Sequence, residues 1–333
     1  MRIGLLVLYV SAALEGRYAV AQDLIEHAGL DAACIDLNQT AMNLTAAGRL
    51  QDSEATLSAA LANPASGAEP PCGWMILHNL ATVMGLSGRL AEAEVLETRS
   101  LTILEKRYPT GDPLLLRPLQ SLAQIQFQER KIAKARETFR RLQSIPAERP
   151  KDRAIVHGLA AMLLYTEGRY REGEAEYLKA LGAWEESGRL ETTDVAAVLG
   201  GLAALYIAAG RYRDSGQALD RALAIVASAK DAVATDWIKL FSTRAELHFR
   251  QREWGAAETD LAAAISAAAR DRQLSRTFLE SVLADYAYVL RKNHRRREAR
   301  AIETRAAALQ SSDLTKEVVD VSELLAKAGT AKK

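Results

Sequence analysis

The amino-acid sequence predicts an all-α fold, an α-solenoid of stacked antiparallel helix hairpins. The first observation behind this prediction is a recurring turn, in its strongest copies a Gly-Arg pair followed by a bulky apolar residue. The turn residues are Gly48, Gly88, Arg130, Gly168, Gly210, Arg252 and His294. They follow one another at intervals of 40, 42, 38, 42, 42 and 42 residues. A fixed period in this range indicates stacked repeats rather than the core of a globular enzyme.

Small residues recur in phase with these turns and form the second observation. Alanine stands seven residues before every turn, at Ala41, Ala81, Ala123, Ala161, Ala203, Ala245 and Ala287. Five residues after the turns stand Ser53, Ala93, Ala135, Gly173, Ser215, Ala257 and Ala299. Two antiparallel helices joined by a tight turn approach closely only where small side chains face each other. The pattern therefore places the close crossing of each hairpin at these positions.

As a third observation, no alternation of apolar and polar residues typical of strands interrupts the helical periodicity. A chain of 333 residues is long enough for about sixteen helices of average length with their linkers. Glycine at the turn allows a left-handed cap at the end of each first helix. Arg130, Arg252 and His294 would adopt the same backbone conformation at some cost in free energy.

The segments 78–97 and 201–223 and the loop 108–113 are the residues on which a family resemblance depends. They resemble tetratricopeptide repeats, and their spacing is most similar to the longer-repeat subclass typified by kinesin light chain. The resemblance extends over roughly residues 35 to 310, and it departs from the family pattern where a turn lacks glycine. It implies a right-handed α-solenoid whose first helices line a concave binding surface.

Residues 1–21 admit two interpretations, and both stay open. The first is a secretory signal peptide, with Arg2 as a basic start, residues 3–14 as the apolar centre and residues 19–21 as a small-x-small cleavage site. The second is the opening helix of a degenerate repeat, because Gly16 and the residues after it copy the turn pattern. Local composition slightly favours the signal peptide, and with it export to the periplasm or cell envelope over a cytoplasmic location.

The interpretation of the two cysteines depends on that choice. Cys34 and Cys72 both lie near the start of the first helix of adjacent hairpins. In a reducing cytoplasm they would be a buried small residue and a loop thiol, whereas export would permit a disulfide between them. A disulfide requires Cα atoms about 4.4–6.8 Å apart.

The repeats indicate one helical domain over residues 22–310, followed by a C-terminal amphipathic segment and tail, residues 311–333. The 43 basic and 42 acidic residues give a net charge of +1, and a general nucleic-acid binder needs an excess of positive charge. No internal apolar stretch reaches the roughly 18–20 residues that span a bilayer. We therefore expect no nucleic-acid partner, and membrane attachment only if residues 1–21 remain as an anchor.

The sequence offers no motif for catalysis, for a cofactor or for a metal ion. The five histidines lie in different parts of the repeat array, at His27, His78, His157, His248 and His294. None has a second ligand at helical spacing, and no phosphate-binding glycine loop, Gly-x-Ser-x-Gly or paired-cysteine motif occurs. Because function must be argued from a site, we expect a protein that is not an enzyme and that uses no cofactor or metal.

Binding is the function that the repeat register supports. If the first helices line the concave surface, as the resemblance implies, they present the residues ten, six and three positions before each turn, an i, i+4, i+7 stripe. The positions expected to contact a partner are Gln120, Gln124, Phe127, Tyr165, Ser242, Glu246, Phe249, Tyr288 and Arg291. Amides, charges and four aromatic anchors suit an extended peptide or a partner helix. The alternative is that these rings pack between neighbouring repeats, since aromatics are common in both cores and interfaces.

Residues 291–297 hold the densest charge of the chain, at the turn of the last full repeat. A solvated end of the solenoid explains such a run, because stacking stops there. Docking to an acidic partner or to anionic lipid headgroups is the alternative.

These observations predict a non-catalytic scaffold that binds a peptide or partner protein in its concave groove. One alternative is a peptide-sensing regulatory receptor whose superhelical pitch changes with ligand. Another is an accessory subunit associated with the cell envelope. The sequence leaves open which protein is bound and what the oligomeric state is.

Overall fold

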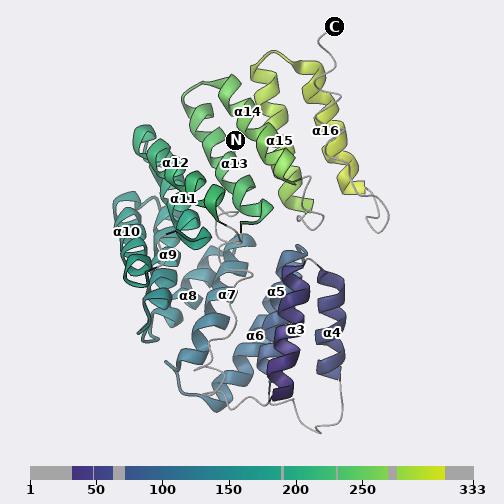
Figure 1. Cartoon of the computed structure of the whole chain (residues 1–333), viewed down its shortest axis with the longest axis vertical. Helices are drawn as coiled ribbons and strands as arrows, with labels where there is room; N and C mark the ends of the chain where they lie inside the picture. The colour runs from purple at the N-terminus through teal and green to yellow at the C-terminus, as the bar shows by residue number, and fades with distance from the viewer. Residues whose placement is uncertain are drawn as a thin grey trace. The chain divides into compact units, whose positions relative to one another are not determined.

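The computed structural model describes residues 32–47, 49–62, 72–188, 191–229, 232–268 and 276–311 (Figure 1). Within these ranges the chain forms α-helices, one 3₁₀ helix and no strand, so the all-α prediction is confirmed. The first helices of the hairpins are α3 (Ala32–Ala46), α5 (Gly73–Leu86), α7 (Leu116–Gln128), α9 (Pro150–Thr166), α11 (Thr193–Ala208), α13 (Ala234–Arg250) and α15 (Arg276–Lys292). The second helices are α4 (Leu50–Ala62), α6 (Leu90–Arg107), α8 (Ile132–Gln143), α10 (Tyr170–Glu186), α12 (Tyr212–Ser228), α14 (Trp254–Ala268) and α16 (Arg296–Ser311). The 3₁₀ helix η2 (Pro113–Leu115) precedes α7.

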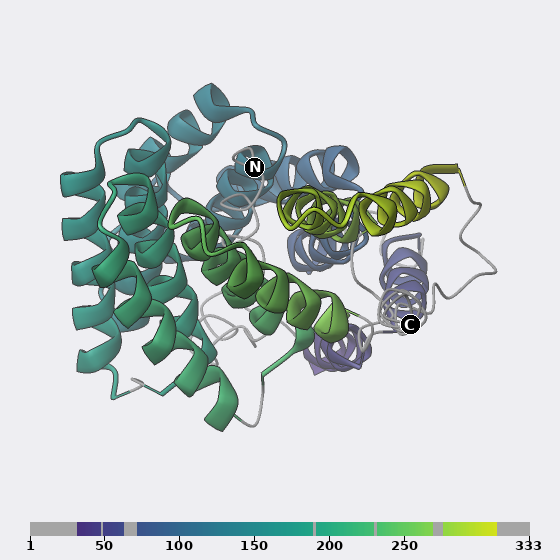
Figure 2. The ribbon, with the colours of Figure 1, turned by 90° about the horizontal axis from the view of Figure 1, so that it is seen from above.

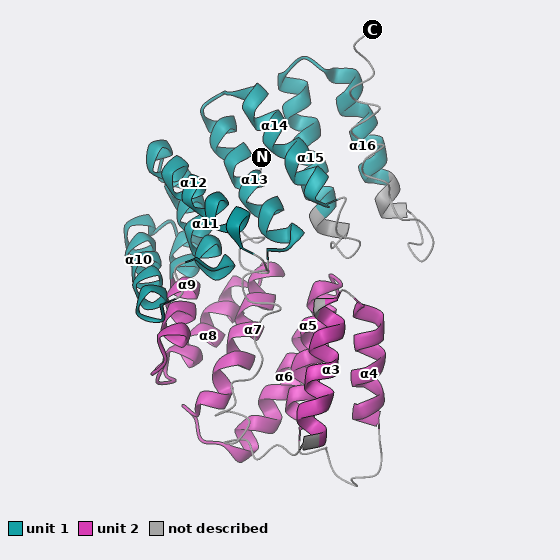
Figure 3. Cartoon of the chain, viewed as in Figure 1, with its two compact units in different colours: residues 1–12, 161–333 teal, residues 13–160 magenta. Residues whose placement is uncertain are grey.

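The chain divides into two compact units, and the division falls inside α9 (Figure 3). The N-terminal unit, residues 13–160, contains α3 to α8 and the first part of α9. The C-terminal unit begins at Ala161 and contains, among the described residues, the end of α9 and α10 to α16. The predicted signal segment and the C-terminal tail after Ser311 lie outside the described residues, so their boundaries stay predictions.

Successive helices pack against one another within each unit. In the C-terminal unit, α11 touches α12, the second helix of its own hairpin, and also α13, the first helix of the next hairpin (Figure 2). In the N-terminal unit, α5 touches α6 and α7 in the same way. First helices therefore lie beside first helices, as the predicted stacking of hairpins requires.

The left-handed turns are present as predicted, including the three that lack glycine. The backbone φ angle is 76° at Gly88, 59° at Arg130, 73° at Gly168, 75° at Gly210, 65° at Arg252 and 63° at His294. The residue after each turn donates its backbone N–H to the carbonyl five residues earlier, as Arg211 does to Tyr206 over 2.8 Å. This bond closes the first helix in a Schellman cap. Gly48 lies outside the described residues.

The small residues lie at the crossing of the two helices in each hairpin. The alanines seven positions before the turns are at most 1% exposed, and the residues five positions after the turns are all buried. A Cβ atom on Gly173 would lie 2.8 Å from Cδ1 of Leu205 and 3.2 Å from the carbonyl oxygen of Ala161. A Cβ atom here would therefore be tight against the backbone of α9 and would displace the Leu205 side chain, as expected for a small residue at the crossing of the two helices.

The basic residue after the turn forms an ion pair with a glutamate of the preceding hairpin. The sequence register did not predict this role. Arg211 donates to Glu174 over 2.7 Å and to Asp214 over 2.6 Å. The equivalent bridges to the preceding hairpin join Arg89 to Glu54, Lys131 to Glu94 and Arg295 to Glu258. An exposed ion pair contributes only about 0–1 kcal/mol. These recurring ion pairs therefore help to fix the register between hairpins and add little to the free energy of unfolding.

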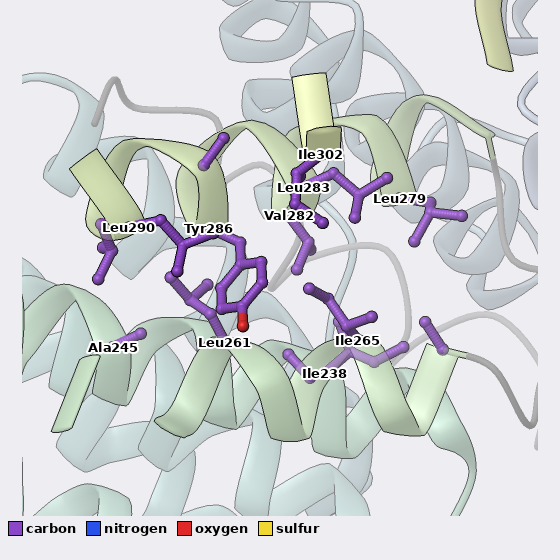
Figure 4. Close-up of a cluster of buried hydrophobic side chains, with 14 of the residues drawn as sticks. Ile238, Ala245, Leu261, Ile265, Leu279, Val282, Leu283, Tyr286, Leu290 and Ile302 are labelled. Atoms are coloured by element: carbon purple, nitrogen blue, oxygen red, sulfur yellow. The ribbon is translucent and has the colours of Figure 1, made fainter. Parts of the chain in front are cut away.

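The core of the C-terminal unit lies between consecutive hairpins (Figure 4). Ile238 of α13 and Leu261 and Ile265 of α14 are buried in one cluster with Leu283 and Leu290 of α15, and all five are 0% exposed. Burying a side chain of this size contributes about 1.5–3 kcal/mol relative to leaving it exposed. Because one cluster draws on two hairpins, each hairpin depends on its neighbour for stability.

Cys34 of α3 and Cys72, which immediately precedes α5, form a disulfide. Their Cα atoms are 5.9 Å apart, within the range that a disulfide requires. Near this bond, Nδ2 of Asn79 donates to Oδ1 of Asn38 over 2.7 Å, and both side chains are buried. The first helices of two consecutive hairpins are therefore joined covalently and by a buried hydrogen bond.

Candidate functional site

The predicted contact residues lie on four of the first helices, α7, α9, α13 and α15. Gln120, Gln124 and Phe127, here called the α7 set, belong to the N-terminal unit. The other six predicted residues belong to the C-terminal unit and are called the C-terminal set. The structure thus gives two sets of residues, and each is described within its own unit.

The α7 set lies in the interior of the N-terminal unit. Gln120, Gln124 and Phe127 are 5%, 4% and 3% exposed. The burial of Phe127 agrees with the packing alternative for this ring. The Nε2 atom of Gln124 is buried and has no hydrogen-bond partner among the described residues. A buried polar atom without a partner costs about 1–3 kcal/mol, so Gln124 is the member of this set that offers a donor to a ligand.

One polar cluster of the N-terminal unit has the residue types of a catalytic triad but not its geometry. His78 Nδ1 lies 2.9 Å from Glu97 Oε1, and Ser121 Oγ donates to Glu97 Oε2 over 3.1 Å. In a triad the histidine accepts the proton of the serine, whereas here the carboxylate lies between the two. Glu97 is 0% exposed, and burial raises the pKa of its carboxyl. The arrangement is a buried polar network that joins α5, α6 and α7.

In the C-terminal set, the rings of Phe249 on α13 and Tyr288 on α15 touch. Their centroids are 5.5 Å apart and their planes are tilted by 48°. Trp254 packs edge-on against Phe249, with 5.1 Å between the ring centroids. Phe249 also packs against the apolar cluster of this unit, while Tyr288 is 38% exposed. Phe249 is therefore a packing residue on one side, and Tyr288 presents its ring to solvent.

Two carboxylates lie near these rings. Oε1 of Glu246, one turn before Phe249, accepts from Nε of Arg250 over 2.6 Å. Its second oxygen, Oε2, is buried without a partner among the described residues, and so is the hydroxyl of Ser242 one turn earlier. Asp285 of α15 is close enough to Glu246 for their charges to repel. Burial, with this repulsion added, raises the pKa of Asp285 to about 6.

Asp285 was missed by the sequence analysis. It stands nine residues before the turn at His294, beside the predicted stripe rather than on it. No signal in the repeat register singles it out, because the rings of α13 and α15 that touch, Phe249 and Tyr288, are 39 residues apart (288 − 249) rather than 42.

Tyr165 is the member of the C-terminal set that lies on α9. Its ring lies 5.9 Å from that of Tyr170, and it packs against the cluster that contains Leu202 and Tyr206. Burial raises the pKa of Tyr165, and the negative charge of Glu246 acts in the same direction. Whether Tyr165 and Glu246 share one binding face stays a prediction.

Two cations of the basic run, Arg291 and Arg295, have acidic partners. Arg291 donates to Glu303 of α16 over 2.7 Å, and Arg295 forms ion pairs with Glu258 and Glu298. The ammonium group of Lys292 lies 5.4 Å from the ring centroid of Tyr288. The partners of Arg291 and Arg295 agree better with a solvated end of the repeat array than with uncompensated charge at these two residues.

The described residues bring together no group of three His, Cys, Asp or Glu side chains that could hold a metal ion. Nor does that part of the chain contain a helix long and apolar enough to cross a membrane. The C-terminal set offers aromatic surface, one carboxylate and unpartnered polar atoms within one compact unit. Such a combination is suited to holding a ligand in a fixed orientation.

Comparison with known proteins reveals likeness in three-dimensional structure. No family model matches the chain, and no curated protein matches it. The crystal structure of BtubC (BKLC) from P. vanneervenii is 18% identical, with a TM-score of 0.52, and the match covers 70% of this chain and 94% of that one. A tetratricopeptide repeat protein from Parabacteroides merdae is 20% identical, with a TM-score of 0.52 and coverage of 89% and 98%. TPR-like repeats of a Podosopora anserina protein assigned to the kinesin light chains are 21% identical, with a TM-score of 0.46 and coverage of 58% and 93%.

At identities of 18% and 20%, the first two likenesses concern the fold. The chain has the fold of a tetratricopeptide repeat protein, and the resemblance found in the sequence is confirmed at that level. The right-handed sense of the superhelix stays a prediction.

Proposed function

We propose that this tetratricopeptide-repeat-like solenoid is a non-catalytic scaffold that binds a peptide or partner protein on the first helices of its hairpins. The fold supports the proposal because stacked hairpins present a surface that is ordered before binding, and little conformational entropy is then lost on association. Fold alone does not assign function, so the argument depends on the residues of the C-terminal set.

The observation on which the proposal rests is the pair of unpartnered polar atoms on α13. The hydroxyl of Ser242 and Oε2 of Glu246 are buried and lack hydrogen-bond partners among the described residues. Most buried polar atoms in folded proteins form hydrogen bonds, so a ligand is a natural source of the hydrogen bonds that these two atoms lack. They lie on the helix face that also carries Phe249, whose ring touches the solvent-exposed ring of Tyr288. Polar atoms beside an exposed ring are typical of a binding face.

The test is capture of partners from native extract by the full chain carrying Phe249→Ala or Tyr288→Ala, compared with the unchanged chain. We expect both variants to lose the captured partner while their helical circular dichroism is unchanged. Leu178→Ala is the matched control, because Leu178 is 52% exposed on α10, a second helix of the same unit. If both variants keep the partner and instead melt several degrees lower, the rings are packing residues and the proposed face is wrong.

The disulfide supports a further part of the proposal, an oxidising location such as the periplasm or cell envelope. Disulfides persist in such compartments and are rare in a reducing cytoplasm. Cys34 and Cys72 are joined in the structure, which favours the exported alternative and an envelope-associated scaffold. A peptide-sensing receptor would differ from a rigid scaffold by changing its superhelical pitch, which small-angle scattering with and without bound peptide measures.

A further inference from the structure

The turn of the last hairpin departs from the repeat pattern in the kind of residue that it carries. Two residues after the turn, the earlier hairpins carry an apolar side chain, namely Leu50, Leu90, Ile132, Tyr170, Tyr212 and Trp254. The last hairpin carries Arg296 at this position, and Arg291 three residues before the turn. In an earlier hairpin these two positions hold rings that touch, Phe249 and Trp254, with 5.1 Å between the ring centroids. Two arginines therefore stand where another hairpin closes its turn with an apolar contact.

The start of α16 also carries cations where a helix disfavours them. Arg296 and Arg297 are the first two residues of α16, and Arg300 follows one turn later. The N-terminal end of a helix carries a partial positive charge, so a cation there is unfavourable. A solvated end of the repeat array needs polar side chains, and uncharged or acidic ones would provide them without this repulsion. Solvation of the end therefore does not explain why arginine stands here.

Five exposed cations in the last two hairpins have no acidic partner among the described residues. They are here called the basic tip and comprise Arg252, Lys292, Arg296, Arg297 and Arg300. Three acids of the same two hairpins are already paired with other cations, Glu303 with Arg291 and both Glu258 and Glu298 with Arg295. The basic tip therefore has an excess of positive charge that the net charge of the whole chain, +1, does not reveal.

The turns of these two hairpins lie side by side. Nδ2 of Asn293 donates to the carbonyl oxygen of Trp254 over 3.3 Å and to Glu258 over 2.6 Å. Arg252, two residues before Trp254, is therefore close to the turn that carries the other cations. Trp254 itself is partly exposed. The basic tip thus combines positive charge with an indole ring, which has an apolar body and a polar N–H.

This combination suits the surface of an anionic bilayer. Anionic headgroups attract Lys and Arg that lie near the surface, and tryptophan is enriched at the level of the headgroups. A pocket for a single phosphate or carboxylate would require the cations to converge. Arg296 and Arg297 are consecutive residues of a helix and do not face each other, and Arg252 stands on another hairpin. A layer of headgroups can neutralise cations spread in this way without such convergence.

We propose that the basic tip docks on an anionic lipid bilayer, with its cations at the headgroups and the indole of Trp254 at the headgroup level. The contact is peripheral, so it needs no helix that crosses the bilayer. The inference goes beyond the proposed function, because it assigns a second surface to the scaffold. The peptide is bound on the first helices, and the bilayer contacts the turns at their ends.

The test is flotation of the full chain with vesicles of phosphatidylcholine, either alone or with about 30% phosphatidylglycerol as the anionic lipid. We expect binding to the anionic vesicles only, and release at about 0.5 M NaCl, because salt screens exposed charges. Arg296→Gln/Arg297→Gln/Arg300→Gln should lower the partition coefficient about 100-fold, as three cations at about 1 kcal/mol each imply. Replacing the same three residues by lysine should leave it nearly unchanged, because a bilayer responds to charge and not to the shape of the guanidinium group.

Arg99→Gln/Lys106→Gln/Arg221→Gln is the matched control, because it removes the same charge from exposed positions on α6 and α12. This variant should bind the anionic vesicles nearly as well as the unchanged chain. Melting temperature separates binding from structure. The glutamine variant of α16 should melt no lower than the unchanged chain, because it removes cations from a helix N-terminus, whereas a structural role for these arginines requires it to melt lower.

Fluorescence tests the place of the indole. On anionic vesicles the tryptophan emission of the chain should shift to shorter wavelength, because the ring of Trp254 leaves water for the headgroup region. Trp254→Phe should lose most of this shift. A shift that persists in full in this variant would contradict the proposed orientation of the tip.

Three other outcomes overturn the inference. Equal binding to neutral and anionic vesicles, or to neither, means that the basic tip is not a docking surface for anionic lipid. Equal loss of binding in the α16 variant and in the matched control places the contact elsewhere on the chain. Loss of binding in the lysine variant as well indicates a partner that recognises arginine geometry, such as an acidic protein. None of these outcomes affects the peptide face, whose test depends on Phe249 and Tyr288.

Discussion

The carbonyl oxygen of Ala161 lies 3.2 Å from the point where a Cβ atom on Gly173 would stand, and Cδ1 of Leu205 lies 2.8 Å from that point. Ala161 and Gly173 are the small residues seven before and five after the turn at Gly168. A methyl group at Gly173 would therefore displace the Leu205 side chain of α11 and press against the backbone of α9.

Gly173→Ala is expected to destabilise the chain by about 1–3 kcal/mol, the usual cost of overpacking, because the carbonyl oxygen of α9 cannot move aside as a side chain can. Gly182→Ala in the same helix is the matched control, since a Cβ there meets nothing within 4 Å. It should stabilise the chain by about 0.5–1 kcal/mol through helix propensity. Urea unfolding of both variants measures the difference. Equal stability of the two would contradict the close crossing.

The left-handed turns predict opposite effects for two exchanges. Gly210→Ala keeps open space around the new Cβ but forces a φ of 75° on a residue that disfavours it, at a cost of about 1–2 kcal/mol. Arg252→Gly relieves the same strain at a φ of 65°. Glycine also raises the conformational entropy of the unfolded chain, which offsets part of this gain, so the exchange should be neutral or stabilise the chain by up to about 1 kcal/mol. Thermal unfolding measures both. A lower melting temperature for Arg252→Gly would mean that the arginine side chain stabilises the turn.

The disulfide predicts a defined thiol count and a local loss of stability on reduction. The full chain holds two cysteines, so alkylation should add no label before reduction and two labels after it, as read by intact mass. The bond closes a separation of 38 residues, and removing it by Cys34→Ser with Cys72→Ser should cost about 2–4 kcal/mol. Hydrogen exchange should locate the loss in α3 and α4. Two labels before reduction would remove the argument for an oxidising compartment.

The sequence predicted the hairpins because their determinants are local. Glycine or a tolerated substitute adopts the left-handed turn, and a small residue permits the close crossing, so both recur at the repeat period. The contacts between hairpins could not be predicted in this way. Arg211 contacts Glu174 at an offset of 37 residues and Phe249 contacts Tyr288 at 39, whereas the repeat period is about 42. These offsets depend on how one hairpin lies against the next, which the period of the sequence does not contain.

The burial of the aromatic residues could not be predicted from the sequence period either. The stripe on the first helices singled out Phe127 and Tyr288 equally, but Phe127 is 3% exposed and Tyr288 is 38% exposed. Period identifies which helix face a residue occupies. Burial depends also on the neighbouring hairpins, so residues of the one predicted stripe are interior in one repeat and open in another.

The pKa of Asp285 makes the stability of the C-terminal unit depend on pH in a direction opposite to that of most carboxylates. Burial raises this pKa from 3.8 to about 6, so the folded state binds the proton more tightly than the unfolded state. The resulting stabilisation is complete below pH 3.8 and is lost as pH rises through 6. Asp285→Asn should therefore gain about 1–3 kcal/mol relative to the unchanged chain at pH 7.5, and almost nothing at pH 3.8 or below.

Chemical denaturation of the two chains at several pH values between 3.5 and about 7.5 measures this difference. Only the difference between variant and unchanged chain is informative, because the other carboxylates titrate equally in both. An equal dependence of the unfolding free energy on pH in the two chains would contradict a raised pKa of Asp285 in the folded state.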